Sequence, residues 1–186
     1  VPIDIVEKIK CSGAEIIDMT GTNIPGMFWR FLVINDNTVD LFIVRDIDSR
    51  INTREENAVI KWIESNKDMH VIRDHPHHYY KILGGMWGLK NKSSNPKTKY
   101  IRGNYMNLLK KFLENKNYKF KRMDDMIFLD QLYFIMKDNI LGHDNFFNFP
   151  ENEYFPGENN DNTKKYYKFV GEIIDADDVP SYLKRD

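Results

Sequence analysis

The stretch VDLFIVRDIDSRINTREENAVIKWIESNKDMHVIRDHPHHYYKILGGMWGLK, residues 39–90, decides the fold. Its residues 41–44 form a continuous apolar run, the pattern of a strand that is buried on both faces. Residues 53–63 are amphipathic, and two further apolar runs follow at residues 69–73 and 82–90, the second around glycines. Strands that alternate with a helix indicate an α/β layered domain.

The helix in this stretch carries its own start signal. Thr53 and Glu56 have the spacing of a capping box, in which each side chain accepts a hydrogen bond from the other residue's backbone N–H. The apolar residues that share one helical face are Ala58, Val59, Trp62 and Ile63. We therefore expect this face to pack inward.

The other elements follow from the same periodicities. We expect helices at residues 3–10, 28–34, 100–115 and 126–138, and a short strand at residues 14–19. The predicted fold class is α/β, with a mainly parallel sheet flanked by helices. The length of 186 residues fits one domain, residues 1–186.

The composition argues against nucleic-acid binding, a membrane span and a disulfide-stabilised fold. Lys and Arg number 27 against 28 Asp and Glu, so no strong positive field attracts nucleic acid. No apolar stretch approaches the roughly 20 residues of a membrane span. A single cysteine, Cys11, excludes an internal disulfide and favours a reducing, cytoplasmic location.

Two aspartates leave the end of the first strand in this stretch. Asp46 and Asp48 are one residue apart, flanked by Arg45, Ser49 and Arg50. In an open α/β sheet ligands bind beyond the carboxyl ends of the strands, and two such carboxylates can share a hard divalent cation. The pair therefore indicates a metal-bound nucleoside diphosphate, with a solvated loop as the alternative.

The same spacing recurs at Asp175 and Asp177, in a polar segment without a strong strand before it. It serves as a comparison for the first pair, because Asp-x-Asp is common by chance. The strand before Asp46 is the feature that distinguishes the two pairs.

The segment RDHPHH, residues 73–78, holds three of the five histidines. Zinc is one interpretation, because imidazole is a common zinc ligand, but neither a cysteine partner nor a helical His-x-x-x-His accompanies it. Asp74 and His75 are interpreted instead as polar groups that face a ligand. A solvated loop is the other alternative.

Glycines surround a tryptophan in ILGGMWGLK, residues 82–90. Glycine within a strand marks a bulge or a close approach of the backbone to a ligand. Gly84 and Gly85 could border a sugar, with Trp87 as a flat apolar wall, or Trp87 could fill the core.

Asp130 and Gln131 lie in the apolar helical segment FLDQLYFIMKDNI. A carboxylate among apolar residues costs free energy unless it is exposed or paired. Asp130 therefore either lies on a solvated face or points into a cleft.

In this order the motifs resemble glycosyltransferases of the GT-A (Rossmann-like) type. The pattern RDIDSR…RE…AV…W…RDHP.H…GGMWG.K is similar to a group of bacterial and viral sugar transferases, over residues 1–171. The resemblance implies that Asp46, Asp48 and His143 bind Mn²⁺ or Mg²⁺, and that Gly84 and Gly85 lie near the donor sugar. It also implies that Asp130 and Gln131 lie beside the reacting carbon.

His143 follows a predicted helix and a glycine in NILGHDNFF, where we expect the chain to turn and present the imidazole. Nothing in the local periodicity marks this residue. Its role as a metal ligand rests on the resemblance.

Such enzymes place about two strand–helix units before Asp-x-Asp to form the pocket for the nucleotide base. Only 45 residues precede Asp46. We therefore expect the first strand–helix units to be lacking, and the sheet to have an incomplete edge with exposed apolar side chains on that side.

The sequence thus predicts a metal-dependent transfer of a sugar from a nucleoside-diphosphate sugar to a glycan or another hydroxyl acceptor. One alternative is a non-catalytic nucleotide- or carbohydrate-binding domain, which the 13% aromatic content favours. Another is a phosphatase of the haloacid dehalogenase type with Asp46 as nucleophile, although Arg50 stands where that motif has Thr or Val.

Overall fold

The computed structural model describes residues 1–157 and 169–174. The comparison pair, Asp175 and Asp177, lies outside the described residues. Contacts divide the chain into two compact units, Val1–Arg30 and Phe31–Asp186. None of the helices in the described ranges is both long and apolar enough to cross a membrane.

The first unit begins with helix α1, Ile3–Cys11, which confirms the predicted helix at residues 3–10. The strand expected at residues 14–19 does not form, and the prediction was wrong. A strand exists only through hydrogen bonds to a neighbouring strand, which local periodicity cannot supply. The 3₁₀ helix η1, Gly26–Asn35, matches the helical segment expected at residues 28–34.

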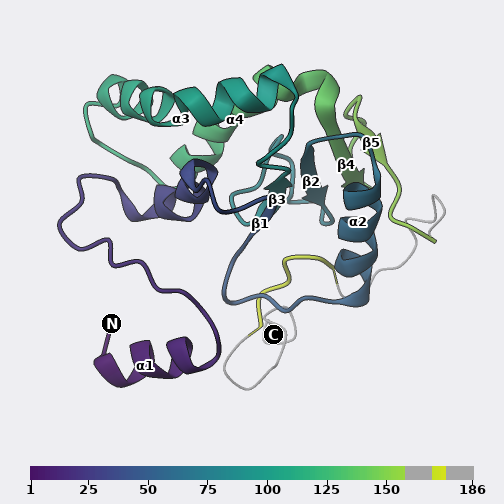
Figure 1. Cartoon of the computed structure of the whole chain (residues 1–186). Coiled ribbons are helices and arrows are strands. Elements are labelled where there is room, and N and C mark those ends of the chain that lie inside the picture. The colour runs from purple at the N-terminus through teal and green to yellow at the C-terminus, as the bar shows by residue number, and fades with distance from the viewer. Residues whose placement is uncertain (158–168, 175–186) are drawn as a thin grey trace. The chain divides into compact units, whose positions relative to one another are not determined.

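The second unit contains a five-stranded sheet (Figure 1). Its strands are β1 (Phe42–Arg45), β2 (Met69–Arg73), β3 (Met86–Leu89), β4 (Ile140–Asp144) and β5 (Asn152–Glu153). The spatial order is β1-β3-β2-β4-β5, with β3 antiparallel to both neighbours and the other two pairings parallel. The sheet is therefore mixed, which corrects the expectation of a mainly parallel sheet.

The connections explain this arrangement. The chain passes from β1 to β2 through helix α2, Thr53–Glu64, and a helical crossover returns the second strand in the direction of the first. Between β2 and β3 the structure has only turns and bends, so β3 runs back against β2. β3 is inserted between β1 and β2, and β1 is an edge strand.

The N-cap of helix α2 lies one residue before the predicted cap, Thr53. Asn52 is the N-cap, and its side chain accepts a hydrogen bond of 2.9 Å from the backbone N–H of Glu55. The predicted capping box of Thr53 and Glu56 was therefore wrong, because Asn52 already satisfies the helix start. Ala58 and Trp62 are buried as expected, whereas Ile63 is 48% exposed.

The remaining helices are α3 (Pro96–Asn115), α4 (Asp124–Met136) and the 3₁₀ turn η2 (Lys137–Asn139). They confirm the helices expected at residues 100–115 and 126–138, with shifted boundaries. Asn95 caps α3 and Pro96 occupies its first turn, a favourable place for proline. α3 and α4 pack against each other on the side of the sheet away from α2 (Figure 1).

The sheet is packed on both faces. On one face His70 stacks on Trp62 of α2, with ring centroids 5.2 Å apart. On the other face Trp87 is fully buried and meets Phe31 and Phe42 edge to face, at centroid distances of 5.8 and 5.4 Å. This double burial accounts for the continuous apolar runs in the sequence.

β1, β2 and β4 run in the same direction, so their carboxyl ends share one edge of the sheet. Asp46 follows β1, Asp74 follows β2, and Asp144 is the last residue of β4. This edge is where α/β sheets bind their ligands. The fold therefore places three carboxylates along the edge expected for a site.

Candidate active site

The Asp-x-Asp loop leaves β1 in a tight turn. The backbone N–H and the hydroxyl of Ser49 both donate to the carbonyl oxygen of Asp46, at 3.3 and 2.9 Å. Asp46 and Asp48 are both exposed. Ser49 thus shapes the loop, and the two aspartates remain accessible to solvent.

The carboxylate of Asp46 lies against the backbone of Gly85. A Cβ atom on Gly85 would be 2.5 Å from Cγ of Asp46 and closer still to Oδ2, distances that real Cβ atoms do not adopt. Gly85 stands one position before β3, beside the end of β1. Both residues were predicted from the sequence, and the structure brings them together.

A distant segment, residues 169–174, crosses this loop. The backbone N–H of Ile174 donates to the carbonyl of Asp48 at 2.8 Å, and Ser49 forms an antiparallel bridge with Ile173. The N–H of Val170 donates to Oδ2 of Asp74 at 2.9 Å. We call residues 169–174 the crossing segment. No local sequence pattern predicts this contact, because it joins residues that are far apart in the chain.

The two flanking arginines differ in placement. Nε of Arg45 forms an ion pair with the buried carboxylate of Glu55 on α2, and its Nη1 donates to the carbonyl of Val44 at 2.7 Å. The guanidinium of Arg45 is therefore engaged by Glu55 of α2 and by the backbone of β1. Arg50 is exposed in the loop.

Asp74 is fully buried and bound by Arg54 of α2 through two hydrogen bonds of 2.7 and 2.8 Å. The guanidinium of Arg54 also lies 3.7 Å from the centroid of the Phe155 ring. A bidentate pair of this kind has a fixed geometry. Asp74 therefore anchors α2 and the crossing segment to the sheet, in place of the predicted ligand contact.

In the 73–78 segment, the ring of His75 contacts the other two histidine rings, edge to face with His77 and tilted with His78. The ring of His75 lies 5.0 Å from that of His77 and 5.5 Å from that of His78, and 4.6 Å from Phe169. Nδ1 of His78 accepts the backbone N–H of Asp74 at 3.2 Å. Burial and the neighbouring histidines lower the pKa of His78 to about 4. These contacts hold the loop together.

Within the described residues, no group of three or more His, Cys, Asp or Glu side chains is arranged to hold a metal ion. This includes the histidine loop, for which zinc was an alternative. Asp46 and Asp48 supply carboxylate oxygens of the type that Mn²⁺ and Mg²⁺ accept. An ion bound there would take its further ligands from water or from a diphosphate.

Trp87 lies in the middle of β3 and is fully buried. Of the two interpretations, core and sugar wall, the structure supports the core. Gly84 is also buried, in the turn that leads into β3. Gly85 alone of this group contacts the Asp-x-Asp loop in a way that its lack of a side chain explains.

His143 lies inside β4, paired with Ile72 of β2, and is fully buried. The expectation of a loop position was wrong, because β4 begins at Ile140, directly after η2. Nδ1 of His143 is 2.8 Å from Nε2 of His70, and its ring contacts Phe155. Burial and the charge of Lys61 lower the pKa of His143 to about 4.

The structure does not bring His143 together with Asp46 and Asp48. β3 and β2 lie between β1 and β4, and three strand spacings amount to about 14 Å. The ring of His143 also faces the α2 side, as its contacts with His70 and Phe155 show. The resemblance-based metal role therefore has no geometric support.

Asp130 lies on α4 and points toward the loop between β2 and β3. Its Oδ2 is 3.5 Å from Nζ of Lys81, and its buried Oδ1 has no hydrogen-bond partner within the described part of the chain. The Asp130 side chain is 30% exposed, so its carboxylate can also be reached from solvent. Gln131 follows it, half-buried on the same helix.

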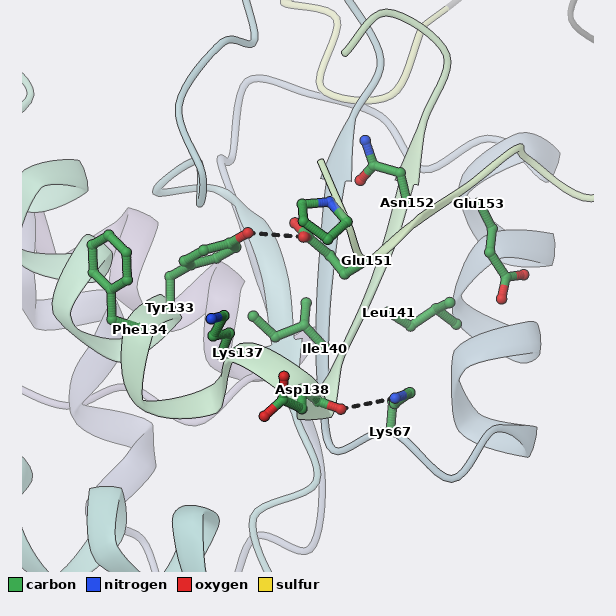
Figure 2. Close-up of a pocket in the computed structure, with 11 residues that line it drawn as sticks. Lys67, Tyr133, Phe134, Lys137, Asp138, Ile140, Leu141, Glu151, Asn152 and Glu153 are labelled. Atoms are coloured by element: carbon green, nitrogen blue, oxygen red, sulfur yellow. Dashed lines mark hydrogen bonds between the residues drawn. The ribbon is translucent and has the colours of Figure 1, made fainter. Parts of the chain in front are cut away.

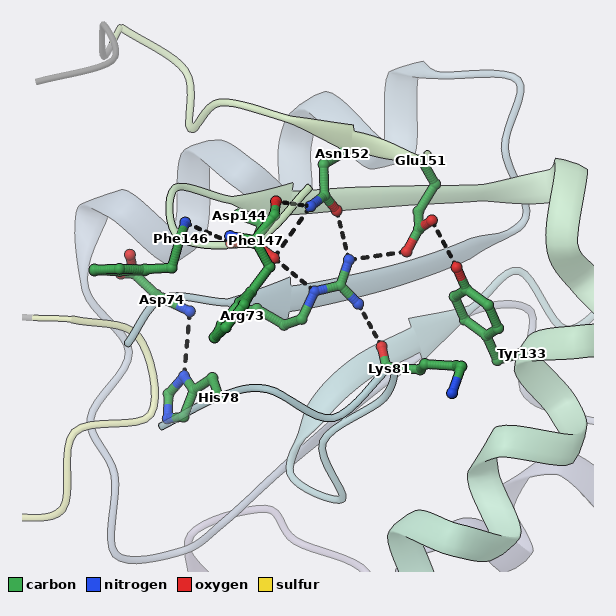
Figure 3. Close-up of polar contacts among 10 residues, drawn as sticks. All are labelled: Arg73, Asp74, His78, Lys81, Tyr133, Asp144, Phe146, Phe147, Glu151 and Asn152. Atoms are coloured by element: carbon green, nitrogen blue, oxygen red, sulfur yellow. Dashed lines mark hydrogen bonds and ion pairs between the residues drawn. The ribbon is translucent and has the colours of Figure 1, made fainter. Parts of the chain in front are cut away.

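Sequence reasoning missed a buried network around Arg73, the last residue of β2 (Figure 3). Nε of Arg73 donates to Asp144 at 2.7 Å, and Nη2 donates to Glu151 and Asn152 at 2.8 and 2.5 Å. The hydroxyl of Tyr133 donates to Glu151 at 2.8 Å, and burial together with this carboxylate raises the pKa of Tyr133 to about 12. The sequence signal that could have indicated this network is Arg73 itself, a charged residue at the end of an apolar strand.

This network fixes the carboxyl edge on the β4 side. Oδ1 of Asp144 accepts the backbone N–H groups of Phe146 and Phe147 at 2.7 and 2.9 Å. The guanidinium of Arg73 also lies 4.1 Å from the centroid of the Phe149 ring. The loop after β4 is therefore tied to β2 before β5 begins.

Comparison with known proteins finds no matching family model and no significant match among curated proteins or solved structures.

Proposed function

We propose that the chain is a glycosyltransferase domain that moves a sugar from a nucleoside-diphosphate sugar to a hydroxyl acceptor with Mn²⁺ or Mg²⁺. The observation that carries the proposal is the seating of the Asp46 carboxylate on Gly85 at the carboxyl edge of the sheet. The sequence resemblance assigns both residues to donor binding. The contact explains why glycine stands at position 85, because any side chain there would collide with the Asp46 carboxylate. A loop that is merely solvated would not require this glycine.

The loop is suited to oxygen-rich ligands. Asp46 and Asp48 are exposed, and the turn made by Ser49 and the crossing segment hold the loop from two sides. A preorganised pair of carboxylates binds a divalent ion with less loss of conformational freedom. When bound, that ion would neutralise charge that develops on the leaving diphosphate.

Asp130 is the candidate for the acceptor side. In the proposed reaction the oxygen of the acceptor hydroxyl bonds to the anomeric carbon, and the bond from that carbon to the diphosphate oxygen breaks. The electron pair leaves with the diphosphate, and Oδ1 of Asp130 receives the hydroxyl proton. Its unpartnered oxygen and the nearby Lys81, at 3.5 Å, support this role.

β1 lies at one end of the strand order, so its outer side is open to a further strand or to a ligand within the described residues. Exposed isoleucines lie on and after this strand, at Ile43, Ile47 and Ile51.

The proposal is tested by binding of Mn²⁺, measured by electron paramagnetic resonance with and without UDP or GDP. We expect one nucleotide to strengthen Mn²⁺ binding, and Asp46→Asn or Asp48→Asn to weaken it at least tenfold. Asp138→Asn, an exposed aspartate on η2, is the control. Equal Mn²⁺ binding by all four proteins would overturn the proposal. A chain that binds both ligands but neither hydrolyses UDP-sugars nor glycosylates acceptors would be a binding domain.

A further inference from the structure

A pocket of about 470 Å³ lies beside β4, between α4 and β5 (Figure 2). Tyr133 and Phe134 of α4 line one side, Asn152 and Glu153 of β5 line the other, and Lys67 lies at one end. Its volume is within the range of about 300–1,000 Å³ typical of ligand sites. None of its lining residues was predicted as a site residue from the sequence.

The pocket exists because β5 is short. β2 lies along the inner side of β4, and on the outer side β5 pairs with Gly142 and His143. Within the described residues, no strand therefore covers the outer side of β4 at Ile140 and Leu141. These two side chains and Pro150 line the pocket with apolar surface. Phe134 adds an aromatic ring that is 62% exposed, an unusual exposure for a side chain of this size.

Most of the charges around the pocket are paired, and among the described lining residues the exposed Lys137 is the exception. Nζ of Lys67 donates to the carbonyl of Asp138 at 2.8 Å, and the Asp138 carboxylate is 3.3 Å from Lys97. Glu153 forms a 2.5 Å ion pair with Lys61. Glu151 is held by the Arg73 network. A neutral ligand rich in hydroxyls can hydrogen-bond to these paired groups and to Lys137 as they stand, and the near balance of charge around the pocket favours such a ligand.

The pocket adjoins the candidate catalytic carboxylate. Asp130 and Phe134 are four residues apart on α4 and lie on the same helical face. Nζ of Lys81 contacts both, at 3.5 Å from Asp130 and 5.2 Å from the centroid of the Phe134 ring. A chain of contacts thus runs from Asp130 through Lys81 and Phe134 into the pocket.

We propose that this pocket holds the non-reacting sugar residues of a neutral oligosaccharide acceptor, whose reacting hydroxyl lies at Asp130. The inference rests on the proposed function for the identity of the bound chain as acceptor. Phe134 stacks on the apolar face of a sugar ring, while the paired side chains of Lys67, Asp138 and Glu153 hydrogen-bond to its hydroxyls.

Saturation-transfer NMR on the full chain tests the inference, with maltotriose and cellotriose as neutral probes. We expect millimolar binding of one trisaccharide and a three- to tenfold weaker Kd in Phe134→Ala, roughly the value of one aromatic contact. Tyr100→Ala is the matched control, because Tyr100 is 50% exposed on α3 and does not line the pocket. Its affinity should equal that of the unaltered chain.

Three outcomes would overturn the inference: no binding of either trisaccharide, equal loss in the two variants, or no loss in Phe134→Ala. The Asp46→Asn variant separates this test from that of the proposed function. If trisaccharide binding depends on Phe134 but Mn²⁺ binding is indifferent to Asp46, the pocket is a sugar site and the transferase proposal fails. If Mn²⁺ and nucleotide bind through Asp46 but no trisaccharide binds, only the pocket proposal fails.

Discussion

Gly85 and Asp46 form a pair whose two members depend on each other. In Gly85→Ala the new methyl group collides with the Asp46 carboxylate, so we expect destabilisation of about 1–3 kcal/mol and loss of Mn²⁺ binding. The free energy of unfolding in urea measures the first effect. Asp46→Ala in the same chain removes the collision and should restore most of the stability, but not the Mn²⁺ binding.

Gly103→Ala is the control for this pair. A Cβ at Gly103 meets no atom within 4 Å, and the residue lies inside α3. Alanine is the better helix former, so this variant should be as stable as the unaltered chain or up to about 1 kcal/mol more stable. Equal behaviour of Gly85→Ala and Gly103→Ala would contradict the contact with Asp46.

The buried Arg73 holds together the carboxyl edge of the sheet near β4 through its ion pairs with Asp144 and Glu151. Arg73→Met leaves the carboxylates of Asp144 and Glu151 buried without their cation, so we expect a loss of about 3–5 kcal/mol in the free energy of unfolding. Lys110→Met, which removes an exposed pair with Glu114 at 3.9 Å, should change it by less than about 0.5 kcal/mol. Similar losses in both variants would argue against the network.

At the scale of single elements, the histidine-rich loop at residues 73–78 makes the free energy of unfolding depend on pH. The pKa of His78 is lowered from 6.5 to about 4 in the fold, so below pH 6.5 the unfolded chain binds more protons than the folded one. Stability is therefore complete above about pH 6.5 and falls as the pH drops toward 4. Each such histidine contributes a slope of at most about 1.4 kcal/mol per pH unit.

His143 adds to the same window, since its pKa is also lowered to about 4. His78→Asn should flatten the decline between pH 6.5 and 4.5 in urea titrations, because asparagine can accept the Asp74 N–H without a titrating ring. Asn in place of Lys110, an exposed residue of α3 away from this loop, should leave the slope unchanged. Identical slopes in the three proteins would exclude His78 as a source.

The elements that sequence analysis identified are those with a strong local pattern. The apolar run at residues 69–73 was sufficient to predict a strand, and β2 has the predicted bounds. β4 was missed because it follows η2 without a turn signal, and its glycine and histidine resemble a loop. The direction of β3 depends on the connection before it, which residue periodicity does not encode.

The residues of the candidate site also divide into those that local patterns predict and those whose roles depend on distant partners. Asp46 and Gly85 were found from strand ends and glycines, since each signal is local. The roles of Asp74 and His143 were set by partners far along the chain, Arg54 and His70, that no spacing rule relates to them. The pocket beside Phe134 depends on the length of β5, a property of the assembled sheet.

For the molecule as a whole, the sheet order predicts a gradient of local stability. β2 is fully buried and hydrogen-bonded to strands on both sides, whereas β1 and β5 are at the edges. Amide hydrogen exchange should therefore be slowest in β2 and at least about tenfold faster in β1. Protection in β1 equal to that in β2 would indicate that another strand covers its outer side.

The crossing segment has a consequence for the order in which the protein acquires its site during translation. Ser49 and Ile173 pair across 124 positions, so a ribosome completes β1 long before it makes the segment that ties the Asp-x-Asp loop. Until then the loop has its own turn at Ser49 and the pairing of β1 with β3. A nascent chain that has emerged only as far as β5 would have the sheet but an untethered loop. If the loop binds a metal ion as proposed, its affinity would reach the final value only after residues 169–174 have emerged and paired with it.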